Sequence, residues 1–212
     1  MNTCYIVCAL DCELDFKLDS SDLVIGADRG YLTLVKNKIK PDVVIGDFDS
    51  YTGEVKCENI IKYPVKKDFT DSALAIEFAL SKGYKKITIY GAIGGMLDHT
   101  LANIALLANY TEKGIDISFV DGDNITFALH NEKVIFDKDT KGRISVFSNT
   151  DISLGVTEKG LLYEVDNITL KNIVPLGVSN EFIGRESEIS VNDGTLIICT
   201  SKENYEKYLT RE

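Results

Sequence analysis

Two aspartates with one residue between them, Asp47 and Asp49, follow the apolar run Val43-Val44-Ile45. Such a run is typical of the end of a buried strand. In an extended segment, side chains at positions i and i+2 point the same way and lie roughly 6.6 Å apart. Two carboxylates held this way repel unless a cation lies between them, and Mg²⁺ binds carboxylate oxygens while sharing its other positions with water and phosphates. The spacing therefore predicts a metal-phosphate site.

The alternative for this pair is structural, because aspartate is common in turns, where it accepts hydrogen bonds from backbone N–H groups. Its position after a buried strand, together with other acidic loops, favours the functional interpretation. Asp28 ends another apolar run, Leu23–Ala27. It either caps the helix that follows or adds a third acid near the metal, with Gly30 allowing the backbone to approach a ligand.

The stretch Lys67-Asp68-Phe69-Thr70-Asp71 opens a predicted helix that ends before Gly83. Thr70 or Asp71 can cap this helix, and Gly83 suits a left-handed position after it. The mixed charge is either a solvated helix start or a phosphate site. In the second case Lys67 neutralises phosphate charge and Asp71 holds metal.

A second candidate segment runs from Gly91 to Asn103. Gly94-Gly95 forms either a plain turn or a backbone cradle for phosphate at the start of a helix, where free N–H groups favour anions. His99 is either a packed, hydrogen-bonded side chain or a ligand contact. Asn103 lies four residues beyond it, on the same helix face.

The first 120 residues alternate strand and helix patterns, which predicts a largely parallel sheet with helices on its faces. Asp28, Asp47, Asp49 and Asp98 all follow strand runs, so they are expected at one edge, beyond the carboxyl ends of the strands. The expected strands are Tyr5–Leu10, Leu23–Ala27, Asp42–Ile45, Lys86–Tyr90 and Ile117–Val120, and the other expected helices are Tyr31–Asn37 and Asp98–Tyr110. The last helix carries an apolar stripe, namely Leu97, Leu101, Ile104, Ala105 and Ala108.

After about residue 122 helical periodicity stops and short apolar runs recur between turn residues, a pattern typical of an antiparallel sandwich. The runs are Val134–Phe136, Ile144–Phe147, Leu161–Tyr163 and Leu196–Cys199, and the polar tail from Lys202 is expected to form a short helix. We therefore predict a Rossmann-like α/β nucleotide-binding domain over residues 1–125 and an antiparallel β-sandwich over 130–212.

The composition excludes several classes of function. A net charge of −10 argues against nonspecific nucleic-acid binding and against an anionic membrane surface. The five scattered cysteines contain no CxxC pair and indicate thiols in a reducing cytoplasm. No signal peptide or membrane span is expected. P-loop, protein-kinase and Ser or Cys nucleophile signatures are missing from the sequence.

Taken together, these segments resemble the bacterial type of the thiamine pyrophosphokinase family. The resemblance rests on Ala27–Gly30, Pro41–Ser50, Lys67–Asp71, Gly91–Gly95, Asp98-His99, Leu101–Asn103, Gly155–Thr157, Lys159–Tyr163, Val178–Glu181 and Gly194–Ile198. It implies Mg²⁺-dependent transfer of pyrophosphate from ATP to the hydroxyl of thiamine, giving thiamine diphosphate and AMP. It also implies a homodimer in which thiamine binds where the first domain of one subunit meets the second domain of the other.

The resemblance also implies roles for individual residues. The metal and pyrophosphate acids would be Asp47, Asp49 and Asp71, with Asp28 in support and Asp98 acting on the thiamine hydroxyl. The nucleotide or phosphate contacts would be Asp28, Ser50, Lys67, Asp68, Gly94, Gly95, His99 and Asn103. Ser179 and Asn180 would contact thiamine. The chain departs from the family at Met96, where an arginine is usual, and at Ala9–Cys12, where a glycine pair is usual.

Two other functions use the same residues. A metal-dependent phosphohydrolase would use the acids with water as the acceptor. A non-catalytic thiamine or nucleotide sensor would keep the fold without turnover, and Met96 in place of a phosphate-binding arginine makes that alternative worth testing.

Overall fold

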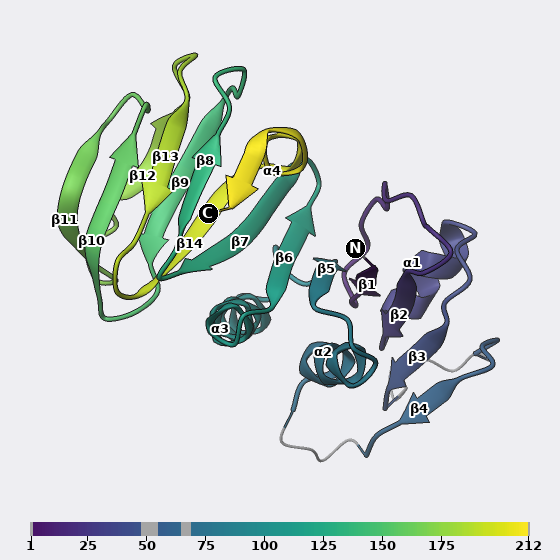
Figure 1. The fold of residues 1–212 in the computed structure, drawn as a ribbon. Helices are drawn as coiled ribbons and strands as arrows, with labels where there is room; N and C mark the ends of the chain where they lie inside the picture. The colour runs from purple at the N-terminus through teal and green to yellow at the C-terminus, as the bar shows by residue number, and fades with distance from the viewer. Residues whose placement is uncertain (1, 48–54, 65–68, 212) are drawn as a thin grey trace. The chain divides into compact units, whose positions relative to one another are not determined.

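The computed structural model describes residues 2–47, 55–64 and 69–211. The chain forms two compact units, one made of Met1–Leu106 and Ile115–Gly122, the other of Leu107–Gly114 and Asp123–Glu212 (Figure 1). The division passes through a single helix, α3 (Leu97–Glu112), after Leu106.

The first unit is built on a parallel sheet with the strand order β6-β5-β1-β2-β3-β4. Its strands are β1 (Thr3–Val7), β2 (Leu23–Ala27), β3 (Val43–Gly46), β4 (Ile60–Lys62), β5 (Lys86–Tyr90) and β6 (Asp116–Asp121). The central strands read as nearly continuous apolar runs because both faces of a parallel sheet are covered. Ile6, Ile25 and Ile45 are accordingly inaccessible to solvent.

Two helices of this unit pack on opposite faces of the sheet. Figure 1 shows α1 (Gly30–Lys36) on one side and α2 (Asp71–Ser81) on the other. This follows from right-handed crossovers, because the chain moves outward from β2 to β3 but back across the sheet from β4 to β5. The hydroxyl of Thr70 caps α2 by accepting from the Ala73 N–H at 3.2 Å, and Gly83 has a φ of 87° after the helix.

The strand order reverses at β1, and this reversal positions the site. From β1 the chain proceeds to β2 on one side, while β5, later in sequence, pairs on the other side. The loops that leave β1 and β5 therefore diverge, and a crevice opens beyond their carboxyl ends. Such switch points are where open α/β sheets bind ligands.

The second unit contains antiparallel sheets, one with the order β12-β9-β14-β7 and the other β11-β10-β13-β8-β15. Phe136 and Phe182 meet in its core with ring centroids 5.0 Å apart. The strands are β7 (Asn124–His130), β8 (Lys133–Phe136), β9 (Arg143–Ser148), β10 (Ile152–Lys159), β11 (Val165–Lys171), β12 (Gly177–Glu181), β13 (Ser187–Ser190), β14 (Thr195–Ser201) and β15 (Leu209–Arg211), with α4 (Lys202–Tyr208) before the last.

The expected fold class is confirmed, and two local expectations are wrong. Leu161–Tyr163 is not a strand, because only Leu161 pairs, through an isolated bridge to Phe182. The apolar stripe on α3 is not a core face at its start, since Leu97 is 72% exposed and Leu101 is 62% exposed. The buried face of that helix instead contains Asn103, Leu107, Ala108 and Tyr110.

Within the described part of the chain, no helix combines the length and apolar character needed to cross a membrane.

Gly30 tests the close approach between α1 and β1. A Cβ at this position would lie 1.8 Å from the carbonyl oxygen of Val7, so Gly30→Ala must push α1 away from the sheet. We expect the free energy of unfolding to fall by about 3 kcal/mol or more, because the added methyl group clashes with main-chain atoms that cannot easily move away. Chemical denaturation measures this loss.

Gly83→Ala is the matched control, because nothing lies within 4 Å of a Cβ at Gly83 and only its positive φ is strained. Its expected cost is about 1 kcal/mol. Equal losses for the two variants would contradict a close approach at Gly30.

Candidate functional site

A cavity of about 370 Å³ lies at the strand-order reversal of the first unit. The segments after β1, β2 and β5 line it, together with the starts of α2 and α3. The loops after β1 and β5 are tied together across the reversal by hydrogen bonds from Cys8 N–H to the Tyr90 carbonyl (2.8 Å) and from Leu10 N–H to the Gly91 carbonyl (3.1 Å). The main chains of these two loops are therefore fixed relative to one another.

Asp28 is half-buried in this wall with a φ of 50°. Its N–H donates to the Ile45 carbonyl at 2.7 Å, which binds it to the end of β3. A side chain at Gly46 would meet the Asp28 Cα at 3.1 Å, so the two backbones are in close contact. Asp47 follows Gly46 directly, so the main chains of these two acidic segments lie close together at this edge of the sheet.

Asp71 enters the same cavity from the first turn of α2. The free N–H groups and the dipole at this helix end favour anions, and Thr70 and Ser72 line the cavity beside Asp71. A phosphate here would meet helix N–H groups, while a cation would meet the carboxylates. This mixture suits a metal-bound phosphate better than either ion alone.

Asn103 is a buried hydrogen-bonding hub behind the cavity. Its Nδ2 donates to the Ala92 carbonyl at 2.6 Å, and its Oδ1 accepts from the Ser72 hydroxyl at 2.9 Å. The Ser72 hydroxyl in turn lies 3.0 Å from that of Thr70. This chain ties the start of α2, the middle of α3 and the loop after β5 into one rigid wall.

Of the other site residues predicted in the first unit, some line the cavity and others do not. Gly95 and His99 line the cavity, whereas Gly94 and the exposed Asp98 do not. One carboxylate oxygen of Asp98 accepts from the His99 N–H at 2.9 Å. Four predicted residues lie outside the described part of the chain, namely Asp49, Ser50, Lys67 and Asp68.

The donor set of this cavity fits a hard divalent cation. Asp28 and Asp71 supply carboxylate oxygens, which Mg²⁺ prefers. Among the residues that the structure describes, no three His, Cys, Asp or Glu side chains form a preassembled metal cluster. Two protein carboxylates with the rest of the shell left to phosphate and water is the usual pattern for Mg²⁺.

Cys8 also lines the cavity, but it is no nucleophile. Burial raises the pKa of its thiol to about 12, so the thiol stays protonated at neutral pH. The cavity therefore offers oxygen ligands and backbone donors, and no covalent chemistry at sulfur.

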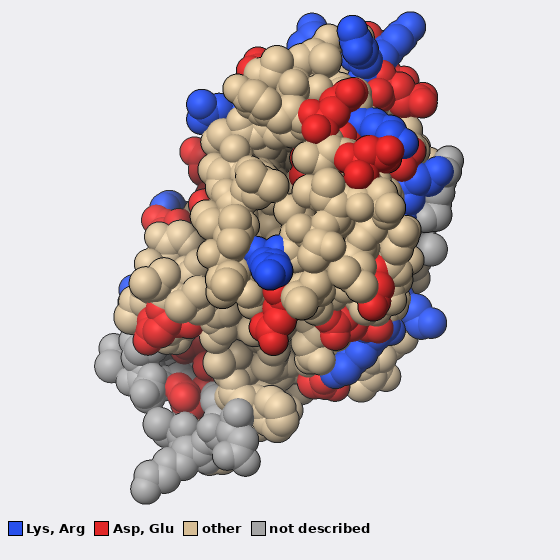
Figure 2. All heavy atoms as spheres, turned by 90° about the vertical axis from the view of Figure 1, so that its left-hand side faces the viewer, with Lys and Arg blue, Asp and Glu red and all other residues tan. Residues whose placement is uncertain are grey.

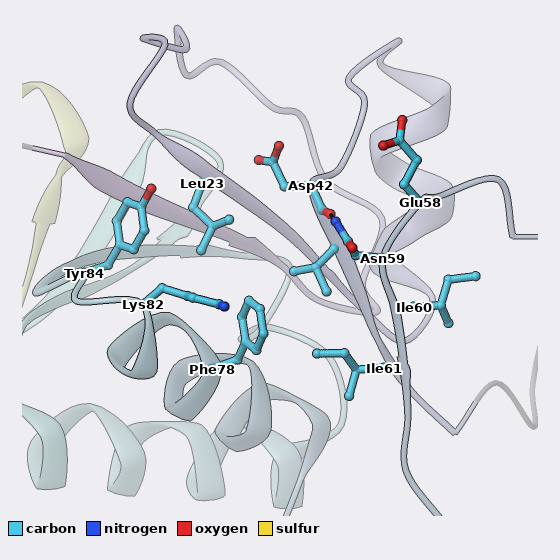
Figure 3. Close-up of a pocket in the computed structure, with 10 residues that line it drawn as sticks. Leu23, Asp42, Glu58, Asn59, Ile60, Ile61, Phe78, Lys82 and Tyr84 are labelled. Atoms are coloured by element: carbon cyan, nitrogen blue, oxygen red, sulfur yellow. Dashed lines mark hydrogen bonds between the residues drawn. The ribbon is translucent and has the colours of Figure 1, made fainter.

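A larger cavity of about 660 Å³ opens at the other edge of this sheet, where β2 and β3 begin (Figure 3). Phe78 and Ile61 form its apolar part, and Asn59 closes its rim by donating to the Asp42 carbonyl at 3.0 Å. None of the site residues predicted from the sequence lines this cavity. Size alone therefore does not identify the site.

In the second unit, a cavity of about 310 Å³ is lined by residues of β10, β11 and β12. Asn180 contributes to its wall and is 4% exposed, with its amide bonded to Glu158, to Glu181 and to both backbone groups of Tyr163. Ser179 is exposed with a φ of 60°, and its N–H donates to the Ser145 hydroxyl at 3.0 Å. The sequence analysis did not identify Glu158 and Tyr163 as site residues, because Glu158-Lys159 resembles an ordinary pair of charged residues before a turn.

Comparisons with known proteins all point to the same protein family. A family model, the catalytic domain of thiamin pyrophosphokinase, matches residues 15–119. A curated thiamine pyrophosphokinase of Bacillus subtilis is 33% identical over 193 residues, which span 87% of this chain and 90% of that one.

Solved structures agree. The crystal structure of Bacillus subtilis thiamine pyrophosphokinase superposes with a TM-score of 0.82 at 30% identity, covering 94% of this chain and 98% of that one. A thiamin pyrophosphokinase family protein of Enterococcus faecalis gives a TM-score of 0.81 at 26% identity, with the same coverage.

Asn103→Ala tests the hub behind the cavity. The change removes both amide bonds and leaves the buried Ala92 carbonyl and Ser72 hydroxyl without this partner, so we expect a stability loss of about 2–4 kcal/mol. Denaturant unfolding measures the loss. Asn37→Ala is the control, because the Asn37 amide donates one bond, to the Thr33 carbonyl at 2.8 Å, from an exposed residue at the end of α1. A loss at Asn103 no larger than at Asn37 would contradict the hub.

Proposed function

The chain belongs to the thiamine pyrophosphokinase family, and from that premise we propose how its residues bind ATP, Mg²⁺ and thiamine. It is an enzyme, a thiamine diphosphokinase that transfers pyrophosphate from ATP to the hydroxyl of thiamine and releases AMP. The observation that carries the proposal is the 370 Å³ cavity, where Asp28 and Asp71 meet at the strand-order reversal.

Asp71, Asp47 and Asp49 are the proposed metal ligands, with Asp28 in support. When bound, Mg²⁺ offsets the charge that builds on the transferred phosphates. Asp71 is supported by its place in the cavity at the start of α2. Asp28 is supported by its fixed backbone, since a strained φ persists only where the surroundings determine it.

The nucleotide is proposed to bind along the same wall. The phosphates meet the N–H groups at the start of α2, and Gly95 and His99 lie on the adjacent wall. Gly94, Ser50, Lys67 and Asp68 remain proposed phosphate or nucleotide contacts on the resemblance alone. Asn103 supports this wall through its two amide bonds.

Asp98 is proposed to orient or deprotonate the hydroxyl of thiamine. Its position in the first turn of α3 is exposed, so it is open to a substrate that arrives from outside the cavity. The attack is in line on the β-phosphorus, and positioning together with electrostatic stabilisation supplies most of the rate.

Thiamine is proposed to bind through the second unit, at Ser179 and Asn180, in a homodimer.

Each unit separately exposes apolar side chains that a monomer would leave in water. Met96, Leu97 and Leu101 are each more than 60% exposed in the first unit. The second unit exposes Leu162, Tyr163, Ile173, Leu176 and Val178, and Figure 2, viewed from the side on which β10 and β11 lie in Figure 1, shows a broad uncharged area. Large apolar patches of this kind mark interaction surfaces.

A cytoplasmic location is part of the proposal. All five cysteines are free thiols, and burial raises the pKa of Cys4 and of Cys8. Such cysteine usage suits a reducing compartment.

Asp71→Asn tests the metal and phosphate role. We expect turnover to fall by about a hundredfold or more, because the developing charge loses a metal ligand. Stability should change by no more than about 1 kcal/mol, the value of an acid in the first turn of a helix. Mass spectrometry of thiamine diphosphate and AMP from thiamine plus MgATP measures the rate, and chelation of Mg²⁺ should abolish it in the unmodified enzyme.

The control is Glu77→Gln, a carboxylate on the exposed side of the same helix. Its rate should stay within about twofold, the usual range for surface substitutions. Phosphate release from ATP without thiamine would instead favour the phosphohydrolase. Thiamine binding without AMP would favour the sensor.

The homodimer is tested by sedimentation equilibrium. The wild type should have twice the 23.5 kDa mass of one chain. Ile173→Glu, at a side chain that is 81% exposed, should shift the mass toward one chain, because a buried unpaired charge costs several kcal/mol. Leu18→Glu, at a 46% exposed leucine of the first unit, is the control and should leave the mass unchanged. A wild type that sediments as one chain would refute the dimer.

A further inference from the structure

Glu158 is a buried acid that no motif of the sequence explains. It lies on β10, is 3% exposed and lines the 310 Å³ cavity of the second unit. Acids are almost never this buried unless something pairs with them. The buried carboxyl group of Glu158 therefore requires hydrogen-bonding partners.

The protein supplies one hydrogen bond to this carboxyl group. The Glu158 Oε2 accepts from the Asn180 Nδ2 at 3.0 Å. In the described residues no basic side chain forms an ion pair with Glu158, and its second oxygen has no hydrogen bond of its own. Burial raises the pKa of this carboxyl, and the bond from Asn180 opposes the rise. A carboxyl that can hold a proton offers one donor and one acceptor side by side.

Most of the remaining cavity lining is apolar. It comprises Val165, Ile168 and Leu170 of β11 together with Leu176 and Val178. Tyr163, 67% exposed, lines the same cavity. A volume of about 310 Å³ is at the small end of ligand pockets. A mostly apolar lining with a few polar groups suits a small heteroaromatic ring with one polar edge.

We propose that Glu158 is a specificity-determining residue that reads an amino-substituted ring edge, donating to a ring nitrogen and accepting from the adjacent amine. In this enzyme the ligand is the aminopyrimidine ring of thiamine, so the inference rests on the proposed binding of thiamine by the second unit. Asn180 is then a positioning residue, because its amide holds Glu158 and both backbone groups of Tyr163.

The competing explanation is that Glu158 only anchors Asn180. Glu158→Leu and a change of substrate together separate the two roles. Leucine removes both the acceptor for the Asn180 amide and the donor–acceptor pair at the ring edge, whereas Glu158→Gln keeps a donor and an acceptor side by side and is the conservative rescue. Activity is measured with thiamine and with 4′-desaminothiamine, in which a hydrogen replaces the ring amine.

If Glu158 recognises the ring edge, Glu158→Leu raises KM for thiamine about tenfold, the cost of a lost bond to a buried polar group. KM for ATP stays the same, the preference of the wild type for thiamine over 4′-desaminothiamine shrinks by a similar factor, and Glu158→Gln retains the wild-type values. Glu186→Gln, at an exposed acid in the turn before β13, is the matched control and changes none of these values.

A Glu158→Leu enzyme that keeps the wild-type preference for thiamine over 4′-desaminothiamine would overturn the inference, because loss of the Asn180 anchor alone affects both substrates equally. A wild type that makes no thiamine diphosphate would instead overturn the proposed function. Should the variant not fold, competition on the wild type decides the matter. The fragment 4-amino-2-methylpyrimidine is expected to inhibit at least tenfold better than 2-methylpyrimidine, which lacks the amine, and equal inhibition would refute a role for the ring amine.

Discussion

The structure depends on the reversal of strand order at β1. Because β2 and β5 pair on opposite sides of that strand, the loops that follow all three strands end at one edge and diverge there. Backbone groups approach closely at this edge: a Cβ at Gly30 would meet the Val7 carbonyl, and one at Gly91 would lie 2.5 Å from the Leu10 carbonyl. The cavity wall is thus set by main-chain packing, which is less adaptable than a wall of side chains.

Electrostatics then decides what this cavity holds. Two carboxylates, Asp28 and Asp71, line it in a chain of net charge −10. Repulsion between unit charges 4 Å apart is about 4 kcal/mol at an effective dielectric of 20, so the triphosphate of the proposed function would enter this cavity more readily with a cation. The start of α2 supplies N–H donors at the same place, and the Asn103 hub keeps that helix end fixed relative to the loop after β5.

The second unit differs in physical character. Its cavity is mostly apolar, with one buried acid, and its surface carries exposed side chains such as Ile173 and Leu176. Phosphate chemistry needs charge and backbone donors, whereas recognition of a flat organic ring needs apolar walls and a few directed polar groups. Under the proposed function, these demands are divided between an α/β unit and an antiparallel one.

The sequence by itself determined the strands β2 and β5, the fold class and the family, because these depend on local periodicity and on ordered motifs. It left the cap of α2 open between Thr70 and Asp71, and the structure assigns this cap to Thr70. Only the tertiary structure decided which side of α3 is buried, since Leu97 and Leu101 carry the right spacing but face water. It also decided that Asn103 is engaged by Ser72 and Ala92, and that Glu158 lies inside a cavity. Burial and partners depend on segments far apart in the chain, and no local pattern of residues encodes that meeting.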